Sequence, residues 1–67
     1  MPISFDTIRV GKKYYLINHG ERYDFVVLSK ISGQNYQLKD LHTLEQYQLE
    51  DLVRYGRGKD YDLNELA

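Results

Sequence analysis

The sequence lacks cysteine and tryptophan, and it has only two histidines and one methionine among its 67 residues. Without cysteine the chain can form no disulfide, no thiolate nucleophile and no cysteine-ligated zinc site. His19 and His42 are too few for a histidine-rich metal site. We therefore expect no metal and no cofactor, and stabilisation by burial alone.

Proline and long apolar runs are also scarce. The only proline is Pro2, so none interrupts a strand in the interior of the chain. No apolar run approaches the ~20 residues that span a bilayer, and the first residues lack the basic and apolar regions of a signal peptide. These absences predict a soluble cytoplasmic protein.

Aromatic residues are abundant, with seven tyrosines and two phenylalanines. A chain this short is at most one domain, predicted over residues 1–67, and its folding must offset about 1.5 kcal/mol of conformational entropy per residue. Without a covalent cross-link, these rings supply much of the apolar area available for burial. The tyrosines are therefore interpreted first as residues of the core and its margin, and only second as binding residues.

The net charge of −1 does not favour generic nucleic-acid binding, but the charge is unevenly distributed. Residues 1–39 carry six basic and three acidic side chains, a balance of +3. Residues 40–67 carry three basic and seven acidic side chains, a balance of −4. The favoured interpretation is pairing of complementary charges across strands; the alternative is two surface poles that orient a partner or a second copy.

Three segments have the composition and alternation of strands. Residues 14–18 are rich in β-formers and precede turn residues at positions 19–21, and residues 36–40 alternate after a four-residue connection. The strongest signal is residues 23–31, where the apolar Val26 and Leu28 lie opposite a second apolar face and predict burial on both sides. That second face would carry Tyr23, Phe25, Val27, Ser29 and Ile31.

Residues 41–55 allow two interpretations. A capping box of Thr43 and Gln46, with Gly56 as the terminal cap, would give one helix of about twelve residues. However, the apolar positions from Leu44 to Val53 spread over roughly 240° of a helical wheel, which is too wide for one stripe. We favour a tight turn over residues 41–44, a short strand over 45–49 and one helical turn over 50–53. Residues 60–66 are predicted to form a last strand or a short turn.

Several residues in this order match a known pattern. Val10-Gly11-Lys12-Lys13 precedes the first predicted strand, Tyr23 precedes the apolar run at 26–28, and residues 36–52 read as strand, turn, strand and Asp-Leu. The ordered set, over residues 10–53, resembles the SH3-like barrels of the Tudor type, and the chain looks like a stand-alone bacterial member. The resemblance implies an all-β barrel of about five short antiparallel strands with one helical turn. Its core would cover about residues 8–56, followed by a C-terminal extension over residues 57–67.

The resemblance also implies where a ligand would bind. Tudor domains hold methylated lysine or arginine in an aromatic cage by cation–π attraction. Carried onto this chain, the cage positions fall at Asn18, Tyr23, Leu38, Leu41 and Thr43. Only Tyr23 is aromatic, and one aromatic wall cannot surround a quaternary ammonium, so a methylated peptide partner is not expected.

A basic face with tyrosines is the other candidate binding surface, because single-stranded nucleic acid stacks on exposed rings beside basic side chains. The acidic second half of the chain would repel phosphate, which weakens this hypothesis. The residues of the nucleic-acid platform are Tyr14, Tyr15, Tyr36, Lys12, Lys13 and Arg22. The candidates for binding any partner are Tyr14, Tyr23, Tyr36, Lys12, Lys13 and Arg22.

Patterns typical of catalysis are missing. Gly56-Arg57-Gly58-Lys59 lacks the spacing of a phosphate loop and is interpreted as a turn with solubilising basic side chains. The hydroxyl residues show no nucleophile pattern, and neighbouring acidic residues in a strand would point to opposite faces. We therefore predict a non-catalytic binding or assembly module without membrane contact. Protein–protein interaction or self-association is the first hypothesis, and single-stranded nucleic-acid binding is the alternative.

Overall fold

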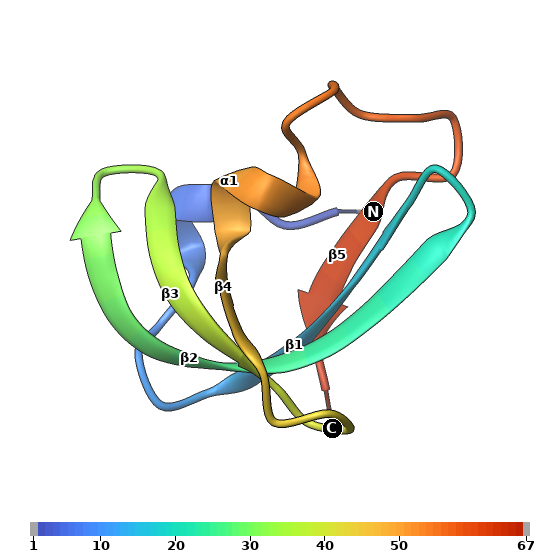
Figure 1. The fold of residues 1–67 in the computed structure, drawn as a ribbon. Helices are drawn as coiled ribbons and strands as arrows, with labels where there is room; N and C mark the ends of the chain where they lie inside the picture. The colour runs from blue at the N-terminus through green and yellow to red at the C-terminus, as the bar shows by residue number, and fades with distance from the viewer. Residues whose placement is uncertain (1, 67) are drawn as a thin grey trace.

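The computed structural model describes residues 2–66, which contain five antiparallel strands, one 3-10 turn and one helical turn (Figure 1). The strands form one sheet in the order β4-β3-β2-β1-β5. Residues 1 and 67, which the predicted domain includes, lie outside the described residues. The elements in chain order are η1 (Phe5–Thr7), β1 (Lys13–Asn18), β2 (Glu21–Ser32), β3 (Asn35–Asp40), β4 (Gln46–Gln48), α1 (Leu49–Leu52) and β5 (Asp62–Glu65).

The predicted strands are confirmed, with boundaries shifted by one or two residues. In residues 41–55 the favoured interpretation is confirmed, because a turn, the short strand β4 and the helical turn α1 follow one another. The alternative single helix of about twelve residues is wrong. α1 begins at a capping box formed by Gln48 and Asp51 and ends at Val53. Of the two alternatives for residues 60–66, a last strand or a short turn, the structure has the strand, β5.

The connection between β1 and β2 is a two-residue turn at His19 and Gly20. Both residues have positive φ, 51° and 77° respectively. Two-residue hairpin turns with positive φ at both positions match the twist of the strands they join, and glycine adopts such angles without steric cost. This turn therefore fixes the register of the pair from Lys13–Val26 to Asn18–Glu21.

β2 is the central strand, and its two halves take part in two different pairings. Residues 21–26 pair with β1, and residues 25–32 pair with β3. Register shifts after Val27 and after Lys30 leave Leu28 and Ile31 as extra residues opposite β3. Bulges of this kind bend a strand and increase its twist. Figure 1 shows β2 curving beneath the N-terminal segment and α1.

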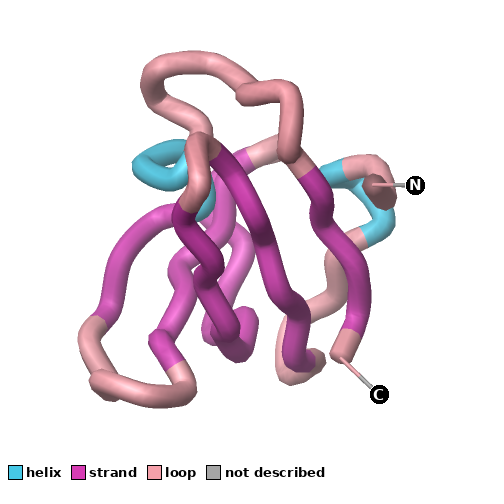
Figure 2. Tube along the Cα trace, turned by 90° about the vertical axis from the view of Figure 1, so that its right-hand side faces the viewer, coloured by secondary structure: helices cyan, strands magenta, loops and turns pink. Residues whose placement is uncertain are grey.

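The sheet is curved but open (Figure 2). β4 and β5 are its two edges, and within residues 2–66 no ladder of hydrogen bonds joins them. The all-β class, with five antiparallel strands and one helical turn, is thus confirmed, whereas the predicted closed barrel is not. Across the same residues, no helix is both long enough and apolar enough to cross a membrane.

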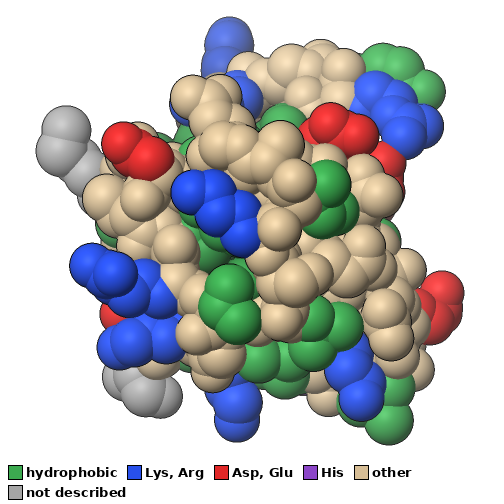
Figure 3. All heavy atoms as spheres, turned by 90° about the vertical axis from the view of Figure 1, so that its left-hand side faces the viewer, with side chains coloured by type: hydrophobic (Ala, Val, Ile, Leu, Met, Phe, Trp, Pro, Cys, Tyr) green, Lys and Arg blue, Asp and Glu red, His purple; other side chains and the backbone are tan. Residues whose placement is uncertain are grey.

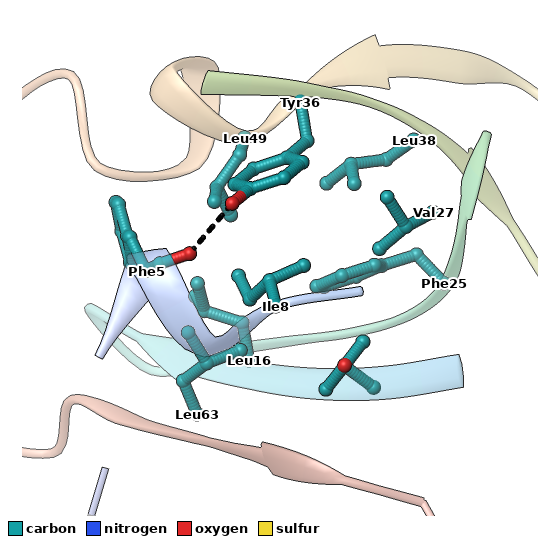
Figure 4. Packing of buried hydrophobic residues seen from close by; sticks show 10 residues of the cluster. Phe5, Ile8, Leu16, Phe25, Val27, Tyr36, Leu38, Leu49 and Leu63 are labelled. Carbon is teal, nitrogen blue, oxygen red and sulfur yellow. Dashed lines mark hydrogen bonds between the residues drawn. The ribbon is translucent and has the colours of Figure 1, made fainter. Parts of the chain in front are cut away.

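The core lies between the curved sheet, α1 and the N-terminal segment (Figure 4). It extends past both ends of the predicted core range, because Phe5 and Leu63 are buried. Leu63 belongs to β5, which pairs with β1 along residues 62–65, within the range predicted as an extension. The buried hydrophobic residues are Phe5, Ile8, Tyr14, Leu16, Phe25, Val27, Tyr36, Leu38, Leu49 and Leu63.

The predicted burial of both faces of residues 23–31 is wrong. Phe25 and Val27 are buried as expected, but Leu28 and Ile31 are 38% and 49% exposed. The bulges interrupt the alternation at 28 and 31, so the second half of β2 no longer continues the core-facing pattern. Ser29, expected on the same face as Phe25, is exposed for the same reason.

Candidate functional site

Tyr14 and Tyr36, two of the tyrosines predicted to bind a partner, are core residues. They are 2% and 1% exposed, so a surface role for their rings is excluded in this fold. The backbone N–H of Arg9 donates to the Tyr14 hydroxyl at 2.9 Å, and the Tyr36 hydroxyl donates to the Phe5 carbonyl at 2.8 Å (Figure 4). These tyrosines hold the N-terminal segment against the sheet.

The basic residues predicted to bind a partner, which lie just before β1, in β1 and in β2, are interleaved with acidic ones. Lys12 pairs with Glu65, with 3.2 Å between Nζ and Oε2, and the Arg22 Nε–H donates to Asp24 at 3.0 Å. The Arg22 guanidinium also stacks 4.7 Å from the centre of the Tyr15 ring. The Tyr15 hydroxyl in turn donates to Asp62 at 2.8 Å, and Lys13 is exposed. The six platform residues therefore do not form one basic aromatic surface.

Tyr23 lies apart from the core tyrosines and contacts Tyr47, a residue that the sequence reasoning did not select. Their ring centres are 6.1 Å apart, with the rings inclined at 68°. The Tyr47 hydroxyl donates to Asp40 at 2.8 Å, and burial raises the pKa of this phenol above its usual value. Both rings are half-buried and pack against the core.

The side chains at the other positions carried over from the Tudor cage contribute to the fold rather than to a cage. Leu38 is fully buried, and the Asn18 side chain binds backbone groups of residues 52–58. Leu41 is half-buried and Thr43 is exposed. The residues at these positions do not surround Tyr23 with further aromatic walls.

Residues of the β3–β4 turn form hydrogen bonds with two aspartates beside Tyr47, Asp24 of β2 and Asp40 of β3. The His42 ring lies 2.8 Å from Asp24, a contact that contributes most to lowering the pKa of this carboxyl. Asp40 accepts hydrogen bonds from the backbone N–H groups of Thr43 and His42, and these bonds lower its pKa. Among residues 2–66, no group of three or more histidine and acidic side chains is arranged to hold a metal ion.

A pocket of about 370 Å³ lies beside the N-terminal segment, where the sequence reasoning placed no site. Its walls come from four parts of the chain: the N-terminal residues, the β2–β3 turn, the segment after α1 and the residue before β5. The lining residues are Pro2, Ile3, Ser4, Phe5, Gln34, Arg57 and Tyr61.

Arg57 is held between two aromatic rings of this pocket. Its guanidinium carbon lies 4.9 Å from the centre of the Phe5 ring and 4.7 Å from that of Tyr61. Cation–π contacts of this kind restrict the guanidinium while leaving its N–H groups able to donate. Within the described part of the chain, Arg57 has no carboxylate partner. Arg57 is an exposed residue of an irregular segment, as predicted, and its contacts with the two rings are a feature that the sequence did not indicate.

Hydrogen bonds from the rest of the fold fix the walls of the pocket. The Ile3 N–H donates to the Leu63 carbonyl at 2.8 Å, and the Phe5 carbonyl accepts the bond from Tyr36. The Gly58 N–H donates to the Asn18 side chain at 2.7 Å, which positions the segment that carries Arg57. Hydrogen bonds to buried residues thus anchor two of the four parts that line the pocket, the N-terminal segment and the segment after α1.

Tyr61 contributes its ring to the pocket, but its hydroxyl points away from solvent. The hydroxyl oxygen is buried and has no hydrogen-bond partner among the described residues. Burial therefore raises the pKa of this phenol. No local sequence signal identifies Phe5, Arg57 and Tyr61 as a group, because Phe5 lies about fifty residues from the other two and meets them only after the N-terminal segment docks.

Large apolar side chains are also exposed on the bulged half of β2. Leu28 and Ile31 lie there, next to the β2–β3 turn that contributes Gln34 to the pocket. Figure 3 views the molecule from the side of this hairpin and shows hydrophobic side chains exposed among Lys and Arg side chains. Tyr55, which follows α1, is 86% exposed and is the most exposed of the tyrosines.

Comparison with known proteins identifies no relative of this chain. No protein-family model, no curated protein and no solved structure matches the chain. The similarity to Tudor-type barrels therefore rests on the residues quoted from the sequence.

Proposed function

We propose that this chain is a non-catalytic module that binds a protein segment in the pocket beside Arg57. The observation that carries the proposal is the position of Arg57, which contacts the rings of Phe5 and Tyr61 at a pocket and has no carboxylate partner among residues 2–66. Arginine and tyrosine are the residues most enriched at the energetic centres of protein interfaces. An unpaired guanidinium on a fixed aromatic support is suited to such a role.

The proposal places the chain among the SH3-like barrels of the Tudor type. Support comes from the order of the elements, with a single helical turn between the fourth and fifth strands. The strongly bent central strand, which pairs with β1 by one half and with β3 by the other, also fits an SH3-like barrel. The cytoplasmic location predicted from the sequence belongs to the same proposal.

A protein partner is favoured over nucleic acid by the composition of the surface. Two of the three tyrosines proposed for base stacking are buried, and the third is covered on one side by Arg22. The exposed apolar residues Leu28 and Ile31, on the half of β2 that leads into the turn with Gln34, provide contacts that a protein segment can use. Self-association is the form of this proposal in which the partner is a second copy of the chain.

Selection of random peptides from a display library against the purified protein tests the proposal. Selected peptides should bind with a measurable Kd by calorimetry, and Arg57→Gln should weaken that binding about tenfold or more. Arg54→Gln is the matched control, because Arg54 lies three residues away and is paired with Asp51. It should leave the affinity unchanged.

Three outcomes would contradict the proposal: no selected peptide, equal weakening by both arginine variants, or tighter binding of a single-stranded oligonucleotide than of any peptide. The oligonucleotide should be titrated at ~50 mM salt, where contacts to phosphate are strongest. Sedimentation at several protein concentrations distinguishes the two forms of the proposal. A concentration-dependent dimer that Arg57→Gln dissociates would identify the partner as a second copy.

A further inference from the structure

We infer that the group recognised in the Arg57 pocket is a carboxylate carried next to an apolar side chain, as at the C-terminal residue of a peptide. The inference rests on the proposed function and specifies its ligand. Its evidence is the combination, in one pocket, of a single fixed guanidinium with apolar walls.

The guanidinium is placed for an anion. The Arg57 guanidinium carbon lies 4.9 Å from the centre of the Phe5 ring and 4.7 Å from that of Tyr61, and a guanidinium in cation–π contact keeps its N–H groups able to donate to a ligand. The planar fork of arginine matches the two oxygens of a carboxylate and binds them through two parallel hydrogen bonds. Because the rings limit the motion of the guanidinium, little side-chain freedom is lost when such a ligand binds.

The remaining walls are suited to an apolar group rather than to a second charge. Pro2 and Ile3 are apolar, and the two aromatic rings add further apolar surface. The polar lining consists of Ser4 and Gln34, neither of which carries a charge. A volume of about 370 Å³ accommodates one or two residues of a peptide.

A C-terminal residue fits these walls better than an internal acidic residue does. In a C-terminal residue the carboxylate and the apolar side chain are attached to the same carbon, so one short group can meet Arg57 and the apolar wall together. An internal aspartate or glutamate brings a carboxylate but no apolar group on the same residue. A phosphate dianion is less suitable, because Arg57 is the only cation among the lining residues that the structure describes.

The acidic side chain that follows the lining residue Phe5 does not pair with the guanidinium. Asp6 follows Phe5 directly, and its carboxylate accepts a hydrogen bond from the Ser4 hydroxyl. No ion pair joins it to Arg57 among the described residues. Because the Asp6 carboxylate is bound to Ser4, a lining residue, its negative charge opposes the binding of an anion, so we expect Asp6→Asn to strengthen binding.

Titration followed by NMR with matched ligands tests the inference. The probes are N-acetyl-leucine, its uncharged amide, a tetrapeptide ending in leucine as the free acid, the same tetrapeptide as the amide, and inorganic phosphate. We expect saturable shifts at residues 2–5, 34, 57 and 61 with both free acids, and binding at least tenfold weaker with both amides. Arg57→Gln should abolish the preference for the acids, and Arg54→Gln should keep it.

The two acids distinguish the sources of the carboxylate. If the tetrapeptide acid binds at least tenfold more tightly than N-acetyl-leucine, the ligand is a peptide C-terminus; if the two bind equally, the ligand is a small carboxylic acid. The inference would be overturned if acids and amides bound equally, if phosphate bound as tightly as the acids, or if none of the probes bound.

These failures differ from failure of the proposed function. If the selected peptides depend on Arg57 but bind equally well as acids and as amides, the proposed protein-binding function stands and the inferred carboxylate ligand is wrong. Arg57→Lys adds a second readout, because it keeps the charge but loses the planar fork. It should retain part of the preference for acids over amides, whereas Arg57→Gln should retain none.

Discussion

Single tyrosine residues contribute to this fold in different ways, which explains why the chain has seven of them. Tyr14 and Tyr36 fill the core and use their hydroxyls to hold backbone groups of residues 9 and 5. Tyr61 contacts the Arg57 guanidinium with its ring, while its buried hydroxyl has no partner in the part of the chain that the structure describes. Tyrosine thus gives a small core both apolar area and a polar atom that can bind a distant segment.

The contrast between two buried hydroxyls can be tested by removing each of them. Tyr36→Phe deletes the donor to the Phe5 carbonyl, and we expect a loss of ~1–2 kcal/mol in the free energy of unfolding. Tyr61→Phe deletes a hydroxyl that has no partner among the described residues, so it should be neutral or stabilising. Urea denaturation of the two variants provides the measurement, and an equal loss in both would contradict the assignment.

Among the elements, the segment from Val53 to Tyr61 depends on side chains of the β1–β2 hairpin. The Asn18 amide donates to the carbonyls of Leu52 and Gly56, both at 3.0 Å, and its oxygen accepts the Gly58 N–H. Asp60 closes the other end of the segment by accepting the N–H groups of residues 19 and 20. A segment without regular structure is in this way held in one position.

Replacing Asn18 by alanine should release this segment. Asn18 is 2% exposed, and its removal deletes three hydrogen bonds to backbone groups, of which, among the described residues, only the Gly56 carbonyl keeps another contact, with the His19 ring at 3.0 Å; the expected cost is about 2–4 kcal/mol. Amide hydrogen exchange should accelerate in residues 53–61 more than in β2 and β3. Gln46→Ala, on the exposed face of β4, is the control and should change neither quantity. Uniform acceleration along the whole chain would instead indicate a loss of global stability alone.

The contact between the Asp60 carboxylate and the backbone N–H groups of residues 19 and 20 should depend on pH. The Gly20 N–H, followed by other backbone N–H groups, lowers the pKa of this carboxyl below its usual 3.8. A carboxyl whose pKa is lower in the folded than in the unfolded state stabilises the fold above pH 4, and this stabilisation is lost as pH falls through the folded value. Asp60→Asn should therefore have a smaller loss of stability than the wild type between pH 4 and pH 2.

Thermal unfolding at intervals across that range measures the difference. Asp6→Asn serves as the control, since Asp6 lies outside this segment. Parallel pH profiles for the wild type and Asp60→Asn would contradict the role of Asp60.

Local sequence patterns predict the elements of this fold well, and the reason can be seen at particular residues. The turn at His19 and Gly20, the alternation of residues 36–40 and the spread of apolar positions after Leu44 all report local geometry. The bulges at Leu28 and Ile31 escaped prediction because they depend on the register against β3. The pocket escaped prediction for a similar reason: Phe5, Arg57 and Tyr61 meet only through tertiary packing.

At the scale of the whole molecule, the uneven charge along the chain is only partly neutralised by contacts between its halves. Lys12 of the basic half pairs with Glu65 of the acidic half, and His42 contacts Asp24. The pairs Arg22–Asp24 and Arg54–Asp51 lie within one half each. Exposed pairs of this kind contribute at most about 1 kcal/mol, so the charges do little to hold the fold together. Stability must come from the buried side chains.

The N-terminal segment is therefore essential to the domain as a whole. A chain of this size has roughly 0.05–0.15 kcal/mol of stability per residue, whereas deleting a buried Phe or Ile side chain costs about 2–5 kcal/mol. Phe5 and Ile8 are 8% and 6% exposed and complete the core from outside the sheet. The double variant Phe5→Ala/Ile8→Ala should consequently be largely unfolded at room temperature, although all five strands keep their own sequences.

Amide proton dispersion in an NMR spectrum, together with the near-ultraviolet circular dichroism of the tyrosines, measures this outcome. Val10→Ala is the matched control, because Val10 belongs to the same segment but is 55% exposed. It should retain the wild-type spectrum and unfolding midpoint. A dispersed spectrum and an unchanged midpoint in the double variant would mean that the curved sheet and α1 form a sufficient core by themselves, and that the N-terminal segment serves only to complete the Arg57 pocket.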